Sequence, residues 1–277
     1  MTGLAFDVVV LAAAVHAGWN ALIKGSDNKL LTTILVCAGS GLVAAVMLPF
    51  LRQPAAASVP FILCSMVLQV CYYALIARAY RIGDMSYVYP IMRGAAPLLV
   101  AVATGLYSAE RLTWVGYAGI GAICAGILLT ALDGRPGKAN AFGAALLNAC
   151  FIATYTLVDG AGVRRSGAPL SYTLWLFLLT SVPLAAWAVV ARRAAFLPYA
   201  RRHAWVGIIG GLASVGAYAP ALWAMTLTPV PVVAALRETS ILFAVAISGL
   251  ILKERVGPAR ILGAACVVAG GAILRLA

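Results

Sequence analysis

The sequence has little charge, and very little of that charge is negative. Of its 277 residues, 20 are Lys or Arg and 8 are Asp or Glu, so 10% are charged, whereas soluble domains carry about 25%. Hydrophobic residues make up 64% of the chain, and the mean hydropathy is +1.00. With so few polar side chains, apolar surface must face lipid as well as the protein interior. The chain is therefore predicted to be an integral membrane protein whose surroundings are a lipid bilayer.

Motifs for cofactors and catalysis are also missing. There is no Walker motif, no His pair at metal-binding spacing and no pair of Asp residues within an apolar run, so we expect no cofactor, no metal and no enzyme activity. Gly39-Ser40-Gly41 with His16 gives a weak alternative, an intramembrane serine protease, because small residues around a serine are a common packing motif. The six cysteines all lie within apolar runs without a CxxC motif, which argues against disulfides and zinc; they are Cys37, Cys64, Cys71, Cys124, Cys150 and Cys266.

The net charge of +12 does not indicate a nucleic-acid partner. A nucleic-acid site needs basic residues clustered on one solvated face or along one helix. Here the basic residues separate the apolar runs, as residues at a bilayer surface do. We expect no binding of nucleic acid.

The apolar runs have the length of membrane spans. A bilayer core about 30 Å thick takes about 20 helical residues, and barrel strands would be shorter and alternating. We therefore predict an all-α polytopic membrane protein with ten transmembrane helices and no soluble domain. The first run lacks a basic leading segment and is expected to be a retained span. The expected spans are 4–23, 30–51, 60–80, 86–107, 112–132, 139–158, 169–191, 204–226, 230–252 and 257–275.

The chain also contains an internal repeat. A shift of 144 residues aligns 88–126 with 232–270 without a gap, and ten positions are identical. Each half then holds five spans, over 1–133 and 134–277, and an odd number inverts the second half relative to the first, as in many secondary transporters. The identical pairs are Val88/Val232, Arg93/Arg237, Leu98/Leu242, Gly105/Gly249, Leu106/Leu250, Glu110/Glu254, Arg111/Arg255, Gly119/Gly263, Ala125/Ala269 and Gly126/Gly270.

These motifs resemble the EamA type of the drug/metabolite transporter (DMT) superfamily. In that family each half ends with a span that has a small or Pro-containing centre, a Glu-Arg turn and a Gly/Ala-rich span. Here the first half has Ala95-Ala96-Pro97 and Glu110-Arg111, and the second half has Glu254-Arg255. The resemblance implies a monomeric exporter of small metabolites, most often amino acids, in the bacterial inner membrane.

Two positions depart from the repeat, and both lie beside the paired arginines. Pro97 aligns with Ile241, and Gly94 aligns with Glu238. The second half therefore lacks the matching proline and gains a charge. We expect an asymmetric site.

Ionisable residues inside spans are the first candidates for that site, because a buried charge in a membrane is costly and usually functional. Arg93 lies well inside its span, and Arg237 holds the same place in the second half. Either arginine can bind a carboxylate through two hydrogen bonds. The alternative is a structural arginine paired with Glu238, which can equally neutralise Arg237.

Aromatic and polar residues at helical spacing complete the candidate site. His16 and Asn20 share one face of their span, and Asp159 lies next to glycines at a span edge, where we expect a loop residue. A cavity lined by such aromatic and polar residues suits a zwitterionic or carboxylate-bearing substrate with an apolar side chain. The predicted substrate-binding residues are His16, Trp19, Asn20, Tyr73, Tyr89, Arg93, Tyr155, Trp175, Tyr218, Arg237 and Glu238.

The expected function is export of neutral or aromatic amino acids by alternating access through a cavity between the halves. A multidrug exporter or an exporter of other metabolites, such as nucleosides or sugar derivatives, is the alternative. Because Glu238 and His16 are the only deep candidates for proton transfer, we expect a facilitator or a weakly coupled exchanger.

The basic loop residues predict one orientation in the membrane, and the family resemblance implies the opposite one. The resemblance implies that both termini are in the cytoplasm. The positive-inside rule assigns the face with more Lys and Arg to the cytoplasm, and here that rule places both termini outside. Loops after odd-numbered spans carry Lys24, Lys29, Arg78, Arg81, Arg135, Lys138, Arg192, Arg193, Arg201, Arg202, Lys253, Arg255 and Arg260, whereas the others carry Arg52, Arg111, Arg164, Arg165 and Arg275.

Overall fold

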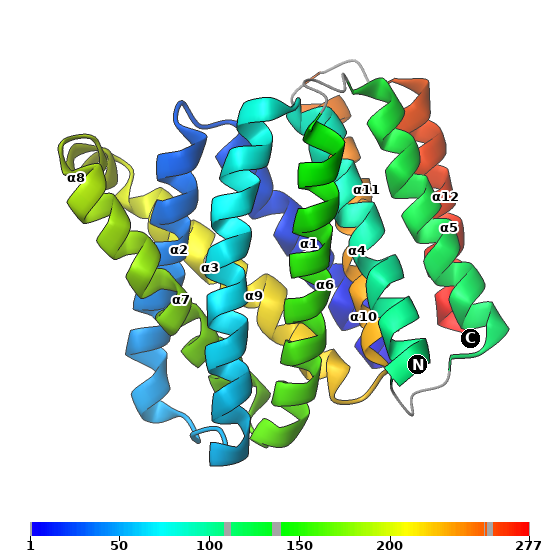
Figure 1. Ribbon diagram of the computed structural model, residues 1–277, viewed down its shortest axis with the longest axis horizontal. Helices are drawn as coiled ribbons and strands as arrows, with labels where there is room; N and C mark the ends of the chain where they lie inside the picture. The colour runs from blue at the N-terminus through cyan, green and yellow to red at the C-terminus, as the bar shows by residue number, and fades with distance from the viewer. Residues whose placement is uncertain (1, 108–111, 135–139, 252, 254–256, 277) are drawn as a thin grey trace.

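A computed structural model describes residues 2–107, 112–134, 140–251, 253 and 257–276, and these residues form helices and short connections without a strand (Figure 1). The Glu-Arg turns of the sequence motif lie outside the described residues. The helices are α1 (Gly3–Lys24), α2 (Lys29–Met47), η1 (Leu48–Phe50), η2 (Ala56–Ser58), α3 (Val59–Ile82), α4 (Met85–Tyr107), α5 (Trp114–Thr130), η3 (Ala131–Asp133), α6 (Ala141–Ser166), α7 (Pro169–Ala191), α8 (Arg193–Arg202), α9 (Ala204–Met225), α10 (Val230–Arg237), α11 (Ser240–Ala246), η4 (Ile247–Ile251) and α12 (Pro258–Leu276).

Several helices begin and end at capping residues. The side-chain oxygens of Thr2, Asn28 and Thr113 accept hydrogen bonds from the backbone N–H three residues later, at the starts of α1, α2 and α5. Such caps satisfy donors that the first turn leaves free. At the end of α6, Gly167 adopts a left-handed conformation with φ of +62°, which lets the chain turn directly into α7.

Nine helices in the described part of the chain are long and apolar enough to cross a membrane, and they correspond to nine of the ten expected spans. The remaining span, expected at 230–252, is divided into α10, α11 and the π-helical turn η4. At the division the N–H groups of Glu238 and Thr239 bind carbonyls three residues back instead of four. The helix therefore tightens there.

Two further elements differ from the sequence predictions. Helix α6 continues to Ser166, eight residues beyond the expected end, because Gly160 and Gly162 pack tightly against neighbouring helices instead of forming a loop. The connection 192–203 contains α8, which is anchored to α2 by the buried Phe196. Figure 1 shows α8 lying across the direction of the long helices.

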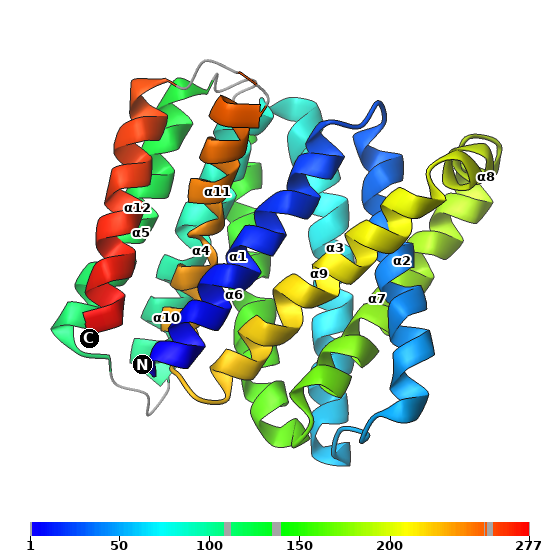
Figure 2. The same ribbon diagram turned by 180° about the vertical axis from the view of Figure 1, so that it is seen from behind.

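The helices form two layers, and each layer takes helices from both halves of the chain. Helices α3, α6 and α4 lie toward the viewer in Figure 1, and α9, α1 and α10–α11 lie toward the viewer in Figure 2. The main packing pairs are α5 with α12, α2 with α7 and with α9, α3 with α6, α1 with α9, and α4 with α6 and with α5.

Glycines allow the closest of these contacts. A Cβ atom on Gly126 of α5 would lie 2.5 Å from the carbonyl oxygen of Gly263 of α12, and one on Gly270 would lie 2.7 Å from the carbonyl oxygen of Gly119. Residues 119 and 126 are the repeat equivalents of 263 and 270. The α5–α12 contact is thus self-complementary, as contacts across a two-fold axis are.

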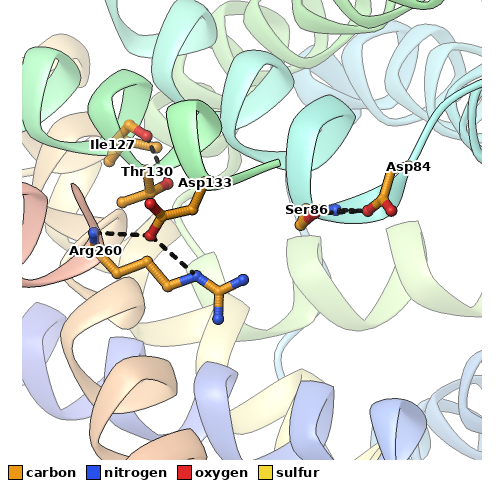
Figure 3. A network of polar contacts seen from close by, with 6 residues as sticks. All are labelled: Asp84, Ser86, Ile127, Thr130, Asp133 and Arg260. Atoms are coloured by element: carbon orange, nitrogen blue, oxygen red, sulfur yellow. Dashed lines mark hydrogen bonds and ion pairs between the residues drawn. The ribbon is translucent and has the colours of Figure 1, made fainter. Parts of the chain in front are cut away.

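The two ends of the bundle differ in their polar contacts. The terminal face carries both chain termini and the connections after α2, α6 and α9 (Figure 1); here Arg164 donates to the carbonyls of Met225 and Thr228. On the opposite face, Asp133 of η3 accepts from the backbone N–H of Arg260 at the start of α12 (Figure 3). Ser86 donates to Asp84 at the start of α4, also in Figure 3.

Candidate functional site

The centre of the bundle holds an ion pair between the two halves of the chain. Arg93 Nε on α4 lies 2.9 Å from Glu238 Oε2 at the end of α10, and the two side chains are 8% and 9% exposed. Arg93 Nη2 is buried without a hydrogen-bond partner in the described structure. The guanidinium group therefore retains an unused donor beside its paired carboxylate.

Arg237 makes a different contact from its repeat equivalent. Its guanidinium carbon lies 4.6 Å from the centre of the Tyr218 ring on α9, in a cation–π arrangement. Glu238 pairs with Arg93 rather than with its neighbour Arg237, although the Arg237 charge also acts on it. The asymmetry that we expected from Gly94 and Glu238 is present in these contacts.

Tyrosines surround the two arginines. The Tyr72 ring on α3 contacts both Tyr73, at 5.2 Å between ring centres, and Tyr155 of α6, at 5.9 Å. Tyr89, one turn before Arg93, interacts electrostatically with Arg93 and Glu238. The predicted residues Tyr73, Tyr89 and Tyr155 thus belong to one aromatic and polar cluster.

A second carboxylate, Asp159 of α6, adjoins this cluster and is fully buried. The hydroxyl of Tyr218 donates to its Oδ2 at 2.6 Å, and the hydroxyl of Tyr172 of α7 donates to its Oδ1 at 3.0 Å. Gln69 Nε2 of α3 lies 3.4 Å from Oδ2. Through these contacts Asp159 of α6 connects this helix to α3, α7 and α9.

The placement of Asp159 corrects the loop position expected from the sequence. The glycines after it suggested a loop, but they belong to α6 and pack against Val230, Phe61 and Tyr172. The signal that could have indicated burial is the spacing of Asn148, Tyr155 and Asp159 along one helical face, since all three are buried. No sequence pattern indicates the contact of Tyr172 with Asp159, because that contact depends on the packing of α7 against α6.

Helix α1 completes the cluster. His16 is subject to the charges of both Arg93 and Arg237, and its ring packs edge-on against Trp19 at 5.1 Å. The side chain of Asn20 donates to the His16 carbonyl at 2.8 Å. Trp19 Nε1 is buried and has no hydrogen-bond partner in the described structure.

The space beside the ion pair is small. The volume that the centre of a water molecule can occupy is about 10 Å³, which is enough for about one water. An amino acid therefore requires α4, α6 and α10 to move apart. The lining residues are Arg93, Ala96, Pro97, Val100, Ile152, Thr156, Ala234, Arg237 and Glu238.

Trp175 lies elsewhere. Its Nε1 donates to Gln53 Oε1 at 2.8 Å, beside a cavity of about 330 Å³ between the 53–54 connection, α3 and α7. Of the predicted substrate-binding residues, it is the one that the structure places at this second cavity. Apart from Gln53, this space is lined by apolar residues, Pro54 among them, so it lacks the charges of the central cluster.

The described residues show no cluster of His, Cys, Asp and Glu that can hold a metal ion. The six cysteines are free thiols. Ser40 donates to the Cys37 carbonyl, and Gly41 packs against Ser181, so the Gly39-Ser40-Gly41 segment is part of the helix packing.

The fold and the apolar helices define a multi-pass integral membrane protein. Residues 140–276 match the EamA-like transporter family, so the second half of the chain contains an EamA-like domain of the DMT superfamily. No curated protein matches the chain. A solved structure described as "Crystal structure of protein" is 18% identical, covers 99% of this chain and 96% of its own, and superposes with a TM-score of 0.75. In all, 28 chains of solved structures match the fold.

Proposed function

We propose that the protein is a secondary transporter that moves small carboxylate-bearing metabolites through the centre of the bundle by alternating access. The observation that carries this proposal is the buried Arg93–Glu238 pair, which joins the two halves and leaves Arg93 Nη2 without a partner. Removing two ions from water costs more than their attraction usually returns. A pair maintained at that cost beside a small internal space suits a binding site better than a structural contact.

The packing of the helices supports an inverted repeat of ten spans. The repeat relates α1 to α6, α2 to α7, α3 to α9, α4 to α10–α11 and α5 to α12. If each helix is replaced by its repeat equivalent, the α3–α6 contact corresponds to the α9–α1 contact. The same replacement leaves the α2–α7 and α5–α12 contacts unchanged. All four contacts are among the main packing pairs. Two such halves can rock about the site between them.

The residues around the ion pair favour neutral and aromatic amino acids as substrates. Arg93 offers two donors in the planar arrangement that matches a carboxylate. The rings of Tyr72, Tyr89 and Tyr155 give apolar faces to a side chain. The unpartnered donor of Arg93 favours an anionic group over the lipophilic cations of the multidrug alternative, whereas other anionic metabolites remain compatible.

The test is exchange of labelled amino acids into proteoliposomes that contain unlabelled substrate. Wild-type protein is expected to exchange phenylalanine and related neutral amino acids. Arg93→Ala is expected to lose at least about ten-fold of this activity, because a charge-assisted contact is worth about 1.5–3 kcal/mol. Arg275→Ala, at an exposed arginine that pairs with Asp7 near the termini, serves as the control and retains activity.

Export from a bacterial cell additionally requires an orientation in the inner membrane. The four arginines around α8 are exposed, as are Arg164, Arg165 and Arg275 of the terminal face, although these three also make contacts within the protein. The loops after odd-numbered spans, which include the α8 connection, carry thirteen basic residues against five in the other loops and the tail. The positive-inside rule then favours a cytoplasmic position for α8. An impermeant thiol reagent applied from outside is expected not to label Arg202→Cys, and strong labelling would reverse the orientation.

A further inference from the structure

The central cluster contains equal numbers of positive and negative groups. Its arginines are Arg93 and Arg237, and its carboxylates are Glu238 and Asp159. With both acids ionised and His16 uncharged, the formal charge is zero. In a low-dielectric interior, adding one unpaired charge to such a cluster is strongly unfavourable.

The two carboxylates are held in different ways. Glu238 makes a direct ion pair with Arg93. Asp159 accepts from two tyrosine hydroxyls and an amide, and its nearest cationic partner, Arg237, lies across the Tyr218 ring. Hydroxyl and amide dipoles can also hold a protonated acid, so Asp159 can become neutral without leaving a cation unpaired.

The charged and titratable groups that face Asp159 come from several helices. They are Tyr172 of α7, Tyr218 of α9 and Arg237 of α10, together with Tyr155 one turn away on α6. Helix α3 contributes the uncharged Ser65 and Gln69. Arg93 of α4 acts on Tyr155, one step further from Asp159.

From this arrangement we infer that Asp159 is a proton site that balances the charge of the substrate. When a substrate carboxylate takes the place of Glu238 on Arg93, Glu238 comes under the charge of its neighbour Arg237, and the cluster gains one negative charge. One proton from solution then forms an O–H bond on Asp159 and restores neutrality. A zwitterion brings its own positive charge and needs no proton.

This inference rests on the proposed function and extends it to a rule of coupling. Zwitterionic amino acids move without a proton, as a facilitator moves them. Anions that lack the ammonium group bind together with one proton. On this inference, the weak coupling expected from the sequence applies to zwitterions and not to anions.

The test is titration calorimetry of the purified full-length protein in buffers with different ionisation enthalpies, which counts the protons taken up per ligand bound. The probes are phenylalanine, a zwitterion, and N-acetylphenylalanine, an anion of similar shape. Wild-type protein is expected to take up about one proton with the anion and none with the zwitterion. Equal proton counts for the two probes would overturn the inference even without a variant.

Variants then assign the proton. Asp159→Asn is expected to bind N-acetylphenylalanine with no proton uptake, Asp159→Glu to restore the uptake, and the surface control Asp7→Asn to behave as wild type. Full uptake in folded Asp159→Asn would overturn the role of Asp159 while leaving transport intact. If neither probe binds the wild-type protein, the proposed function itself fails.

Discussion

Helix α4 and the α10–α11 segment align in the sequence repeat but fold differently. Helix α4 is continuous although it contains Pro90 and Pro97, whereas the second segment breaks at Glu238–Thr239 without an internal proline. Proline therefore does not decide where this pair of segments is interrupted. The break coincides instead with Glu238, whose equivalent in the first half is Gly94.

Local contacts explain the difference. At position 94, a Cβ atom would lie 2.9 Å from Leu128 Cγ, so α4 packs closely on α5 there. At the equivalent position, Glu238 extends to Arg93, and the hydroxyl of Thr239 donates to the Leu236 carbonyl at 2.7 Å. Irregular backbone at membrane depth is tolerated where it lines an interior site. The comparison thus supports the proposed site beside the irregular member of the pair.

The largest expected effect comes from separating the ion pair. Glu238→Gln leaves Arg93 buried without a carboxylate, and the free energy of unfolding is expected to fall by about 3–5 kcal/mol. Replacing both residues by apolar ones, in Arg93→Met with Glu238→Leu, is expected to restore stability while abolishing transport. Unfolding in detergent measures the first effect, and proteoliposome exchange measures the second. Recovery of transport in the double variant would contradict the assignment.

The hydrogen bonds to Asp159 give the next effect. Tyr218→Phe removes the 2.6 Å bond to Oδ2 and keeps the ring under Arg237, so we expect a loss of about 1.5–3 kcal/mol from the hydrogen bond to a charged group. Tyr172→Phe removes the 3.0 Å bond alone and is expected to cost less. The same unfolding measurement ranks the two variants. A larger loss for Tyr172→Phe would show that the Tyr218 hydroxyl is not the main partner of Asp159.

The α5–α12 contact offers a symmetric counterpart to the asymmetric site. Gly126→Ala and Gly270→Ala are each expected to destabilise the protein by about 1–3 kcal/mol, through overpacking against a facing backbone. Their effects are expected to be similar because the two positions are equivalent across the contact. Gly121→Ala, where nothing lies within 4 Å, is the matched control. Clearly unequal losses would argue against a two-fold relation of the halves.

The smallest effect is expected at the exposed ion pair near the termini. Arg275 Nη1 lies 3.1 Å from Asp7 Oδ1, and the side chains are 55% and 64% exposed. Exposed pairs gain little over water. Asp7→Asn is therefore expected to stay within about 0.5 kcal/mol of wild type, in contrast to the buried pair.

The sequence is most informative where a pattern extends over many residues. Apolar runs locate nine of the long helices, because each run has the length of a membrane span. An arginine repeated at the same place within two apolar runs is enough to select Arg93 and Arg237 as site candidates. The inverted ten-span arrangement itself stays a prediction, which the helix contacts support.

Features that depend on contacts between distant residues are not predictable in the same way. Glu238 has Arg237 beside it in sequence, yet it pairs with Arg93, 145 positions away in the chain. Asp159 has the sequence surroundings of a loop residue, because the close packing of its neighbouring glycines is decided by other helices. Helix α8 has too few residues for a strong apolar pattern, and it becomes evident through the contact of Phe196 with α2.

The most direct test of the account is the affinity for phenylalanine of two variants, measured by calorimetry on purified protein. If a substrate carboxylate displaces Glu238 from Arg93, then Glu238→Gln removes the competitor and is expected to bind phenylalanine more tightly than wild type. Arg93→Gln removes the binding group and is expected to abolish binding. Weaker binding by Glu238→Gln, or retained binding by Arg93→Gln, would contradict a substrate site at this ion pair.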